Sequence, residues 1–133
     1  MILTGILIYV LFTHFVADFV MQTHDMAINK STSVYWLTKH IFAYAKTFLV
    51  SALVFCVALT LFEDGYGSKL ALRMVVFVLI NSGLHWITDY YTSKEISRLW
   101  KEKKVHDFFV MIGFDQFIHL ATLLLTLYLV FTF

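Results

Sequence analysis

The sequence predicts an all-α integral membrane protein, a bundle of four transmembrane helices with both termini on the outer side. Of its 133 residues, 60% are hydrophobic and only 14% are charged, and the mean hydropathy is +0.79. A soluble domain carries about a quarter of its residues as charged side chains, so this chain lacks the polar surface that water would require. It contains no proline, which favours long helices without kinks.

Four stretches are apolar enough for spanning helices, each of which needs about 20 residues. They are residues 2–22, 34–62, 69–91 and 108–133. A polar segment at residues 23–33 joins the first two, and a short acidic turn at residues 63–67 joins the second to the third. No repeat or linker divides the chain, so we expect residues 1–133 to form one domain.

The connection at residues 94–107 is the most charged part of the chain. It carries Lys94, Arg98, Lys101, Lys103 and Lys104 against Glu95, Glu102 and Asp107. Because positively charged connections stay on the cytoplasmic side, this segment predicts the orientation of the bundle. Its apolar residues recur at helical spacing, which fits an amphipathic turn at the membrane interface or a solvated continuation of the third helix.

Three histidine–aspartate pairs lie inside the apolar segments, and the members of each pair are four residues apart. They are His14 with Asp18, His85 with Asp89, and Asp115 with His119. Residues four apart share one face of a helix, and ionisable residues at membrane depth are costly and typically functional. The last pair is reversed in order, as is the direction of its helix.

Residue counting at about 1.5 Å per residue turns these pairs into two layers. The three histidines fall at similar depths, and the three aspartates lie one turn nearer the cytoplasm. His40 is expected near the cytoplasmic surface, at the mouth of the site.

Imidazole and carboxylate groups are the usual ligands of zinc, manganese and iron. The sequence therefore predicts one or two divalent ions, with zinc favoured over manganese or iron. The expected ligands are His14, Asp18, His40, His85, Asp89, Asp115 and His119. Asp18, Asp89 and Asp115 are also the candidate catalytic residues, as ligands or general base. An open coordination position would hold a water of lowered pKa that can attack an ester or phosphoester.

Four further polar residues in the apolar segments are candidates for substrate binding. They are Gln22, Lys46, Asn81 and Gln116. Each also fits the role of a structural hydrogen-bond partner or, for Lys46, of a side chain that reaches the membrane surface.

The histidine–aspartate pairs also fit two roles without a metal, namely hydrogen bonding between helices and a proton or ion relay. Serine, threonine and asparagine make hydrogen bonds between helices at lower cost, so the first of these roles accounts poorly for three aspartates. His24 with Asp25, and His106 with Asp107, lie in polar connections and are interpreted as solvated charges.

The pattern resembles a family of small bacterial and phage inner-membrane proteins known as a domain of unknown function. The residues that carry the resemblance are His14-x-x-x-Asp18-Phe19-x-x-Gln22, Lys30, His40, His85-x-x-x-Asp89 and Phe114-Asp115-Gln116-x-x-His119. More distantly, the chain resembles the LexA-regulated inner-membrane metal-dependent hydrolases, which repeat H-x-x-x-D motifs in apolar helices. The second resemblance implies a hydrolase, and the first makes a phage origin unsurprising.

The sequence thus predicts a metal-dependent hydrolase of the bacterial inner membrane, with its site in the cytoplasmic leaflet. The expected substrate is a phospholipid or an isoprenoid phosphate. The alternatives are a proton- or metal-ion-coupled transporter or channel, and a metal-stabilised membrane interaction protein without catalysis. Membrane lipids are the expected partners, no feature predicts nucleic-acid binding, and a small bundle is compatible with a homo-oligomer.

Overall fold

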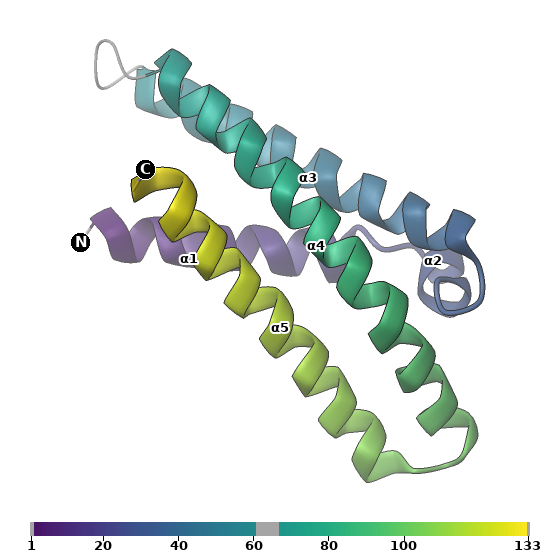
Figure 1. Ribbon diagram of the computed structural model, residues 1–133. Helices are drawn as coiled ribbons and strands as arrows, with labels where there is room; N and C mark the ends of the chain where they lie inside the picture. Colours follow the sequence, from purple (N-terminus) through teal and green to yellow (C-terminus); the bar gives the residue numbers. More distant parts are fainter. Residues whose placement is uncertain (1, 61–66, 133) are drawn as a thin grey trace.

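The computed structural model describes residues 2–60 and 67–132, and every regular element in these ranges is helical. Figure 1 shows their order: α1 (Ile2–Phe15), the π-helical turn η1 (Val16–Val20), α2 (His24–Asn29), α3 (Val34–Thr60), α4 (Gly67–Lys101) and α5 (Val105–Thr132). The predicted all-α class is confirmed. Most of the predicted turn at residues 63–67, and the predicted helix ends at residues 62 and 133, lie outside the described residues.

Three helices are long and apolar enough to cross a membrane. They contain Val34–Ala58 in α3, Leu70–Lys101 in α4 and Val105–Thr132 in α5. These lengths and compositions indicate a membrane protein. The first apolar segment forms a shorter helix, Thr4–Val20, so the fourth span and the orientation of the termini stay predictions.

A π-helical turn ends the first apolar helix. The Met21 N–H donates to the Val16 carbonyl, five residues back, at 2.9 Å. A π-turn encloses one more residue than an α-turn and is frequent at functional sites. Here η1 buries Ala17 and Asp18 together, so it directs a carboxylate toward the other helices.

The polar connection after η1 contains the short helix α2. Thr23 caps its N-terminus, because the hydroxyl Oγ1 accepts from the Met26 N–H at 3.3 Å. The helix packs against α3, and Figure 1 shows it beside the beginning of that helix. The connection is thereby folded back against the bundle.

The predicted charged connection at residues 94–107 is largely helical. α4 continues to Lys101, ten residues past the predicted end at residue 91, and α5 begins at Val105. Arg98 pairs with Glu95 and, at 2.9 Å, with Glu102, while Leu99 is buried. Charged pairs three and four residues apart stabilise a solvated helix. Of the two predicted forms, the structure has the helical continuation.

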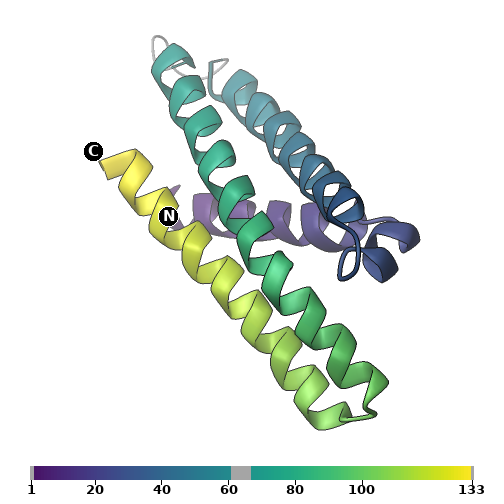
Figure 2. The same cartoon turned by 45° about the vertical axis from the view of Figure 1, so that its right-hand side comes forward.

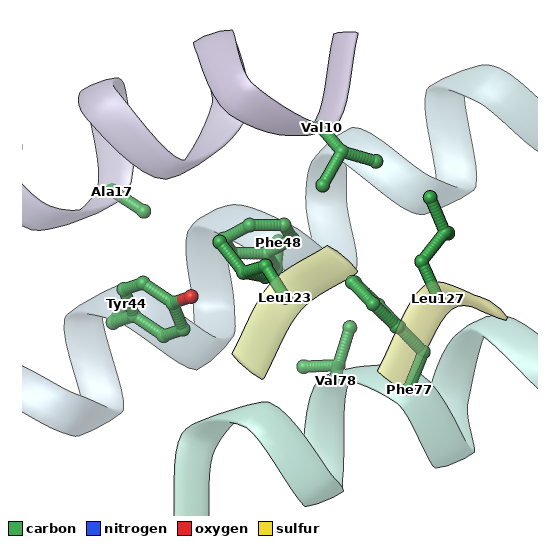
Figure 3. Close-up of a cluster of buried hydrophobic side chains, with 8 residues drawn as sticks. All are labelled: Val10, Ala17, Tyr44, Phe48, Phe77, Val78, Leu123 and Leu127. Carbon is green, nitrogen blue, oxygen red and sulfur yellow. The ribbon is translucent and has the colours of Figure 1, made fainter. Parts of the chain in front are cut away.

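The hydrophobic core joins α1 and η1 to the three long helices α3, α4 and α5. Figure 3 shows side chains from α1, η1, α3, α4 and α5 directed toward one another, namely Val10, Ala17, Tyr44, Phe48, Phe77, Val78, Leu123 and Leu127. α4 and α5 pack along each other, and in Figures 1 and 2 their connected ends extend beyond the remaining helices. α4 has 35 residues, about 52 Å of helix, whereas the hydrocarbon core of a membrane is about 30 Å thick.

Candidate metal centre

The three predicted pairs and His40 form one buried group, which we call the His/Asp cluster. Its members are His14, Asp18, His40, His85, Asp89, Asp115 and His119. Each of these residues is at most 7% exposed. The cluster takes side chains from α1, η1, α3, α4 and α5, so the fold brings together residues from nearly the whole chain.

Three histidine rings of the cluster pack against one another. His85 stacks on His119 with ring centroids 4.0 Å apart, and the His14 centroid lies 6.0 and 5.7 Å from these two. Tyr44 covers His85 at a centroid distance of 4.3 Å, and its hydroxyl Oη lies 3.4 Å from His14 Nδ1. These contacts agree with the single histidine layer that the reversed third pair predicts.

His40 lies at the centre of the cluster and not at its mouth. It is fully buried, and its Nε2 is 3.1 Å from Asp18 Oδ1, 3.2 Å from His85 Nε2 and 3.3 Å from Asp89 Oδ2. The predicted position was wrong because residue counting treats the helices as parallel, whereas α3 runs obliquely to α4 and α5 (Figure 1).

Asp89 of α4 and Asp115 of α5 both face His119. Asp89 Oδ1 lies 3.2 Å from His119 Nε2, and Asp115 Oδ1 lies 3.3 Å from the same nitrogen. The Thr92 hydroxyl donates to Asp115 Oδ1 at 2.5 Å, and the Gln116 amide donates to Asp115 Oδ2 at 3.2 Å. His119 therefore joins two carboxylates, one from each helix.

Three overlapping groups within the described residues have ligand atoms close enough to share an ion. They are Asp18 with His85 and His119, His40 with His85 and Asp89, and Asp89 with Asp115 and His119, with all ligand atoms of a group within 4.8 Å of one another. Because His85, Asp89 and His119 each belong to two groups, the groups form one centre. The cluster could thus hold a metal ion.

His14 belongs to none of these three groups. Its Nε2 lies 3.8 Å from Asp18 Oδ2 and 3.4 Å from Gln116 Oε1. It borders the centre from the side of α1, where it approaches one possible ligand, Asp18, and the Gln116 side chain, which donates to two of the cluster's carboxylate oxygens, Asp18 Oδ2 and Asp115 Oδ2.

Two of the predicted substrate-binding residues contact the cluster directly. The Gln22 amide Nε2 lies 3.1 Å from His40 Nδ1, and the Gln116 Nε2 donates to Asp18 Oδ2 at 3.0 Å. Both glutamines are half-buried, in contrast to the buried residues that they touch. They lie where the cluster approaches the molecular surface.

The other two predicted substrate-binding residues lie elsewhere. Lys46 is exposed on α3, and no ion pair of the described residues links it to the cluster. Asn81 is buried one turn before His85, and its amide donates to the Phe77 carbonyl at 2.9 Å and to Thr126 Oγ1 at 2.7 Å. Through the bond to Thr126, Asn81 links α4 to α5, and no hydrogen bond between the described residues joins it to the cluster.

Lys30 reaches the cluster although its sequence position does not predict this. It follows α2, and its Nζ lies 2.8 Å from Asp89 Oδ2. Burial opposes the charged form, but the neighbouring Asp89 and Asp18 outweigh this and raise the pKa of Lys30 above its ordinary value. The side chain is therefore an ammonium at neutral pH. The only sequence signal was its place in the family-like pattern, since a lysine in a polar connection is usually solvated.

Comparison with known proteins provides a family but no function. No curated protein and no solved structure matches the chain. Residues 6–133 match a family described as "Protein of unknown function (DUF3307)", a range that covers nearly the whole sequence and every residue of the His/Asp cluster. The chain therefore belongs to the DUF3307 family.

Proposed function

We propose that this protein is a membrane-embedded, metal-dependent hydrolase that acts on a phosphate-bearing lipid, such as a phospholipid or an isoprenoid phosphate. The observation that carries the proposal is the convergence of four histidines and three aspartates in one buried cluster. Buried carboxylates without compensating charge are strongly disfavoured, and a divalent cation compensates several of them at once. The distant resemblance to LexA-regulated inner-membrane hydrolases agrees with this chemistry.

The proposed roles follow from the contacts. His40, His85, His119 and the three aspartates would hold one ion or two adjacent ions, with zinc favoured over manganese or iron. A bound ion supplies Lewis-acid activation of a phosphoryl oxygen and of the attacking water. Asp18, Asp89 and Asp115 contribute the general base or ligands, while Thr92 and Gln116 fix the orientation of Asp115.

The membrane setting of the proposal is a bundle of four spans in a bacterial inner membrane. α1 and η1 together cover residues 2–20, which is about 28 Å of helix and close to the thickness of the hydrocarbon core. The lysines near the α4–α5 turn, together with Lys30 and Lys39, favour the cytoplasm for that end of the molecule and the outer side for both termini. Membrane lipids then reach the cluster from its polar end.

The decisive test measures metal in the purified protein. We expect the parent, in detergent, to contain near-stoichiometric zinc, manganese or iron by elemental mass spectrometry, and the double variant His85→Ala, Asp115→Ala to contain none. The matched control is His106→Ala, Asp107→Ala, which removes the same residue types from exposed positions. It should retain the metal and the hydrolysis of phospholipid substrates. A folded parent that contains no metal and cannot be loaded would refute the proposal.

A second candidate function, proton- or metal-ion-coupled transport, is favoured by a different observation. Tyr9, Thr13 and Ser51 are linked by hydrogen bonds, with 3.0 Å between Thr13 Oγ1 and Ser51 Oγ, next to His14. Together with the hydrogen bond between Asn81 and Thr126, these hydroxyls place polar groups on the side of the cluster that faces the two chain termini. Metal or proton flux into liposomes containing the protein, lost in the His85→Ala, Asp115→Ala variant, would favour transport over hydrolysis.

A further inference from the structure

Among the described residues, Lys30 is the one lysine or arginine whose side chain forms an ion pair with the His/Asp cluster. The other ion pairs of lysine and arginine in those residues join Arg98 and Lys104 to Glu95 and Glu102, at the far end of α4. The Lys30 side chain is 17% exposed, whereas its partner Asp89 is 2% exposed. The Lys30 side chain therefore reaches from the partly exposed α2–α3 connection to a buried carboxylate.

The oxygen that Lys30 contacts is also the one that the histidines of α3 and α4 face. Asp89 Oδ2 lies 2.8 Å from Lys30 Nζ, 3.3 Å from His40 Nε2 and 3.6 Å from His85 Nε2. A divalent ion held by His40, His85 and Asp89 would therefore use the region next to the ammonium. Two like charges at that distance repel strongly in a buried site, so the ion and Lys30 compete for Asp89.

The surroundings of Lys30 suit an anion once Asp89 is occupied. Its four-carbon side chain is flexible and carries a compact charge with three donors. Gln22 and Gln116, which are also half-buried, bring amide donors to the same cluster. Lysine is a common phosphate ligand in proteins. Lys30, Gln22 and Gln116 thus bring one ammonium and two amide groups to the same cluster, and such donors suit the non-bridging oxygens of a phosphate group.

We infer that Lys30 is a substrate-binding residue, which leaves Asp89 when a divalent ion binds and then pairs with a phosphate oxygen of the substrate. This inference rests on the proposed function and specifies how that site recognises its substrate. The ligand class is a phosphate monoester or diester anion. Its source is a lipid headgroup or a soluble phosphate compound.

The alternative role for Lys30 is purely structural, as a tether between the α2–α3 connection and α4. The two roles differ in the sign of their effects. Removing a tether loosens the site, so metal and phosphate should both bind more weakly. Removing a competing cation that also binds phosphate should tighten metal binding and weaken phosphate binding.

The experiment compares the parent with Lys30→Gln, Lys30→Arg and Lys39→Gln in detergent. Lys39 is exposed on α3 and lies over the rings of Tyr35 and Trp36, so its replacement changes the net charge equally without touching the cluster. Calorimetry measures the affinity for zinc alone. On the zinc-loaded protein it then measures the affinities for inorganic phosphate and for short-chain phosphatidic acid.

For Lys30→Gln we expect zinc to bind about tenfold more tightly and the phosphate probe about tenfold more weakly, as for the loss of one charge-assisted contact. Lys30→Arg should largely restore phosphate affinity, and Lys39→Gln should match the parent.

A Lys30-dependent response to phosphatidic acid alone assigns a lipid source, and a response to both probes assigns the phosphate group itself. Two results for Lys30→Gln would refute this inference: unchanged phosphate affinity, or weaker binding of both zinc and phosphate. Neither result would contradict the proposed metal site. A folded parent that binds neither zinc nor manganese nor iron would refute the proposed function as well.

Discussion

The hydroxyl of Thr92, on α4, contacts the carboxylate of Asp115 on α5. This hydroxyl has one hydrogen to donate and two acceptors within reach, Asp115 Oδ1 at 2.5 Å and the Thr88 carbonyl oxygen at 3.0 Å, of which Asp115 Oδ1 is the closer. Loss of a residue that orients a metal ligand through a hydrogen bond typically lowers metal affinity by about 10- to 100-fold. Thr92 is thus a positioning residue for the carboxylate of α5.

Replacing Thr92 by valine keeps the shape of the side chain and removes the hydroxyl. We expect zinc affinity to fall about tenfold, because Asp115 loses a donor and gains freedom to rotate. Calorimetric titration with zinc measures the change, and Thr92→Ser should restore most of the affinity. Equal affinities in Thr92→Val and the parent would show that Asp115 is not oriented by this bond or is not a ligand.

The sequence singled out the members of the cluster and, beside it, Gln22 and Gln116, but it did not predict the contact of Lys30. Four-residue spacing placed His14 with Asp18, and the reversed order of Asp115 and His119 placed them at matching depth. Lys30 escaped prediction because its approach depends on how α2 folds back, and no periodic pattern encodes that path. Lys46 has the same charge and a more apolar setting, yet it is exposed on α3, away from the cluster.

The end of α4 shows how a long helix stops without a glycine. Lys103 adopts a positive φ of 58°, its N–H donates to the Trp100 carbonyl at 3.1 Å, and the Lys104 N–H donates to the Leu99 carbonyl at 3.1 Å. This pair of bonds is the Schellman motif, whose left-handed position favours glycine. A lysine at that position is conformationally strained.

Lys103→Gly should therefore stabilise the turn between α4 and α5 by about 1 kcal/mol. Lys101→Gly, at the last residue of the helix, should instead destabilise it by up to about 1 kcal/mol. Thermal unfolding in detergent and hydrogen exchange of the amides at residues 98–108 measure both effects. The strain argument would fail if Lys103→Ala stabilised the turn as much as Lys103→Gly.

Hydropathy located the long helices but not all of their ends. It measures suitability for lipid, so it stopped the third helix at residue 91, where the charged residues begin to accumulate. The ion pairs of Arg98 continue that helix for a reason unrelated to lipid. The π-helical turn η1 was not predictable either, since the sequence around Asp18 has no proline or glycine to mark a change of pitch.

Beside the hydrophobic core, residues of every long segment also meet in the His/Asp cluster. The His/Asp cluster contains side chains from α1, η1, α3, α4 and α5, whereas the connected ends of α4 and α5 extend beyond the other helices (Figure 2). A ligand bound at such a junction stabilises the complete bundle, because no helix can separate without losing a contact to it.

Zinc should accordingly raise the unfolding temperature of the protein, and a chelator should lower it. At a free zinc concentration of about 100 times the dissociation constant, the gain is about 2.7 kcal/mol. The gain should shrink as the pH falls, because protons compete with the ion for imidazole. Scanning fluorimetry with zinc or a chelator at several pH values measures this, and the His85→Ala, Asp115→Ala variant should show no response to zinc.

The distribution of the cluster along the chain also has a consequence for biogenesis. Chains are made from the N-terminus onward, so Asp18 is delivered with the first helix long before Asp115 and His119 of α5 exist. An aspartate at the centre of an isolated spanning helix costs about 2.5–3.5 kcal/mol on the insertion scale, and Asp18, in the π-helical turn that ends the first helical segment, lies where this cost is smaller. Asp18 can pair with His40 and His85 as α3 and α4 are made, and Asp89 can pair with Lys30. The last histidine and the last carboxylate, His119 and Asp115, come only with α5. A chain that ends before α5 would therefore carry an incomplete cluster.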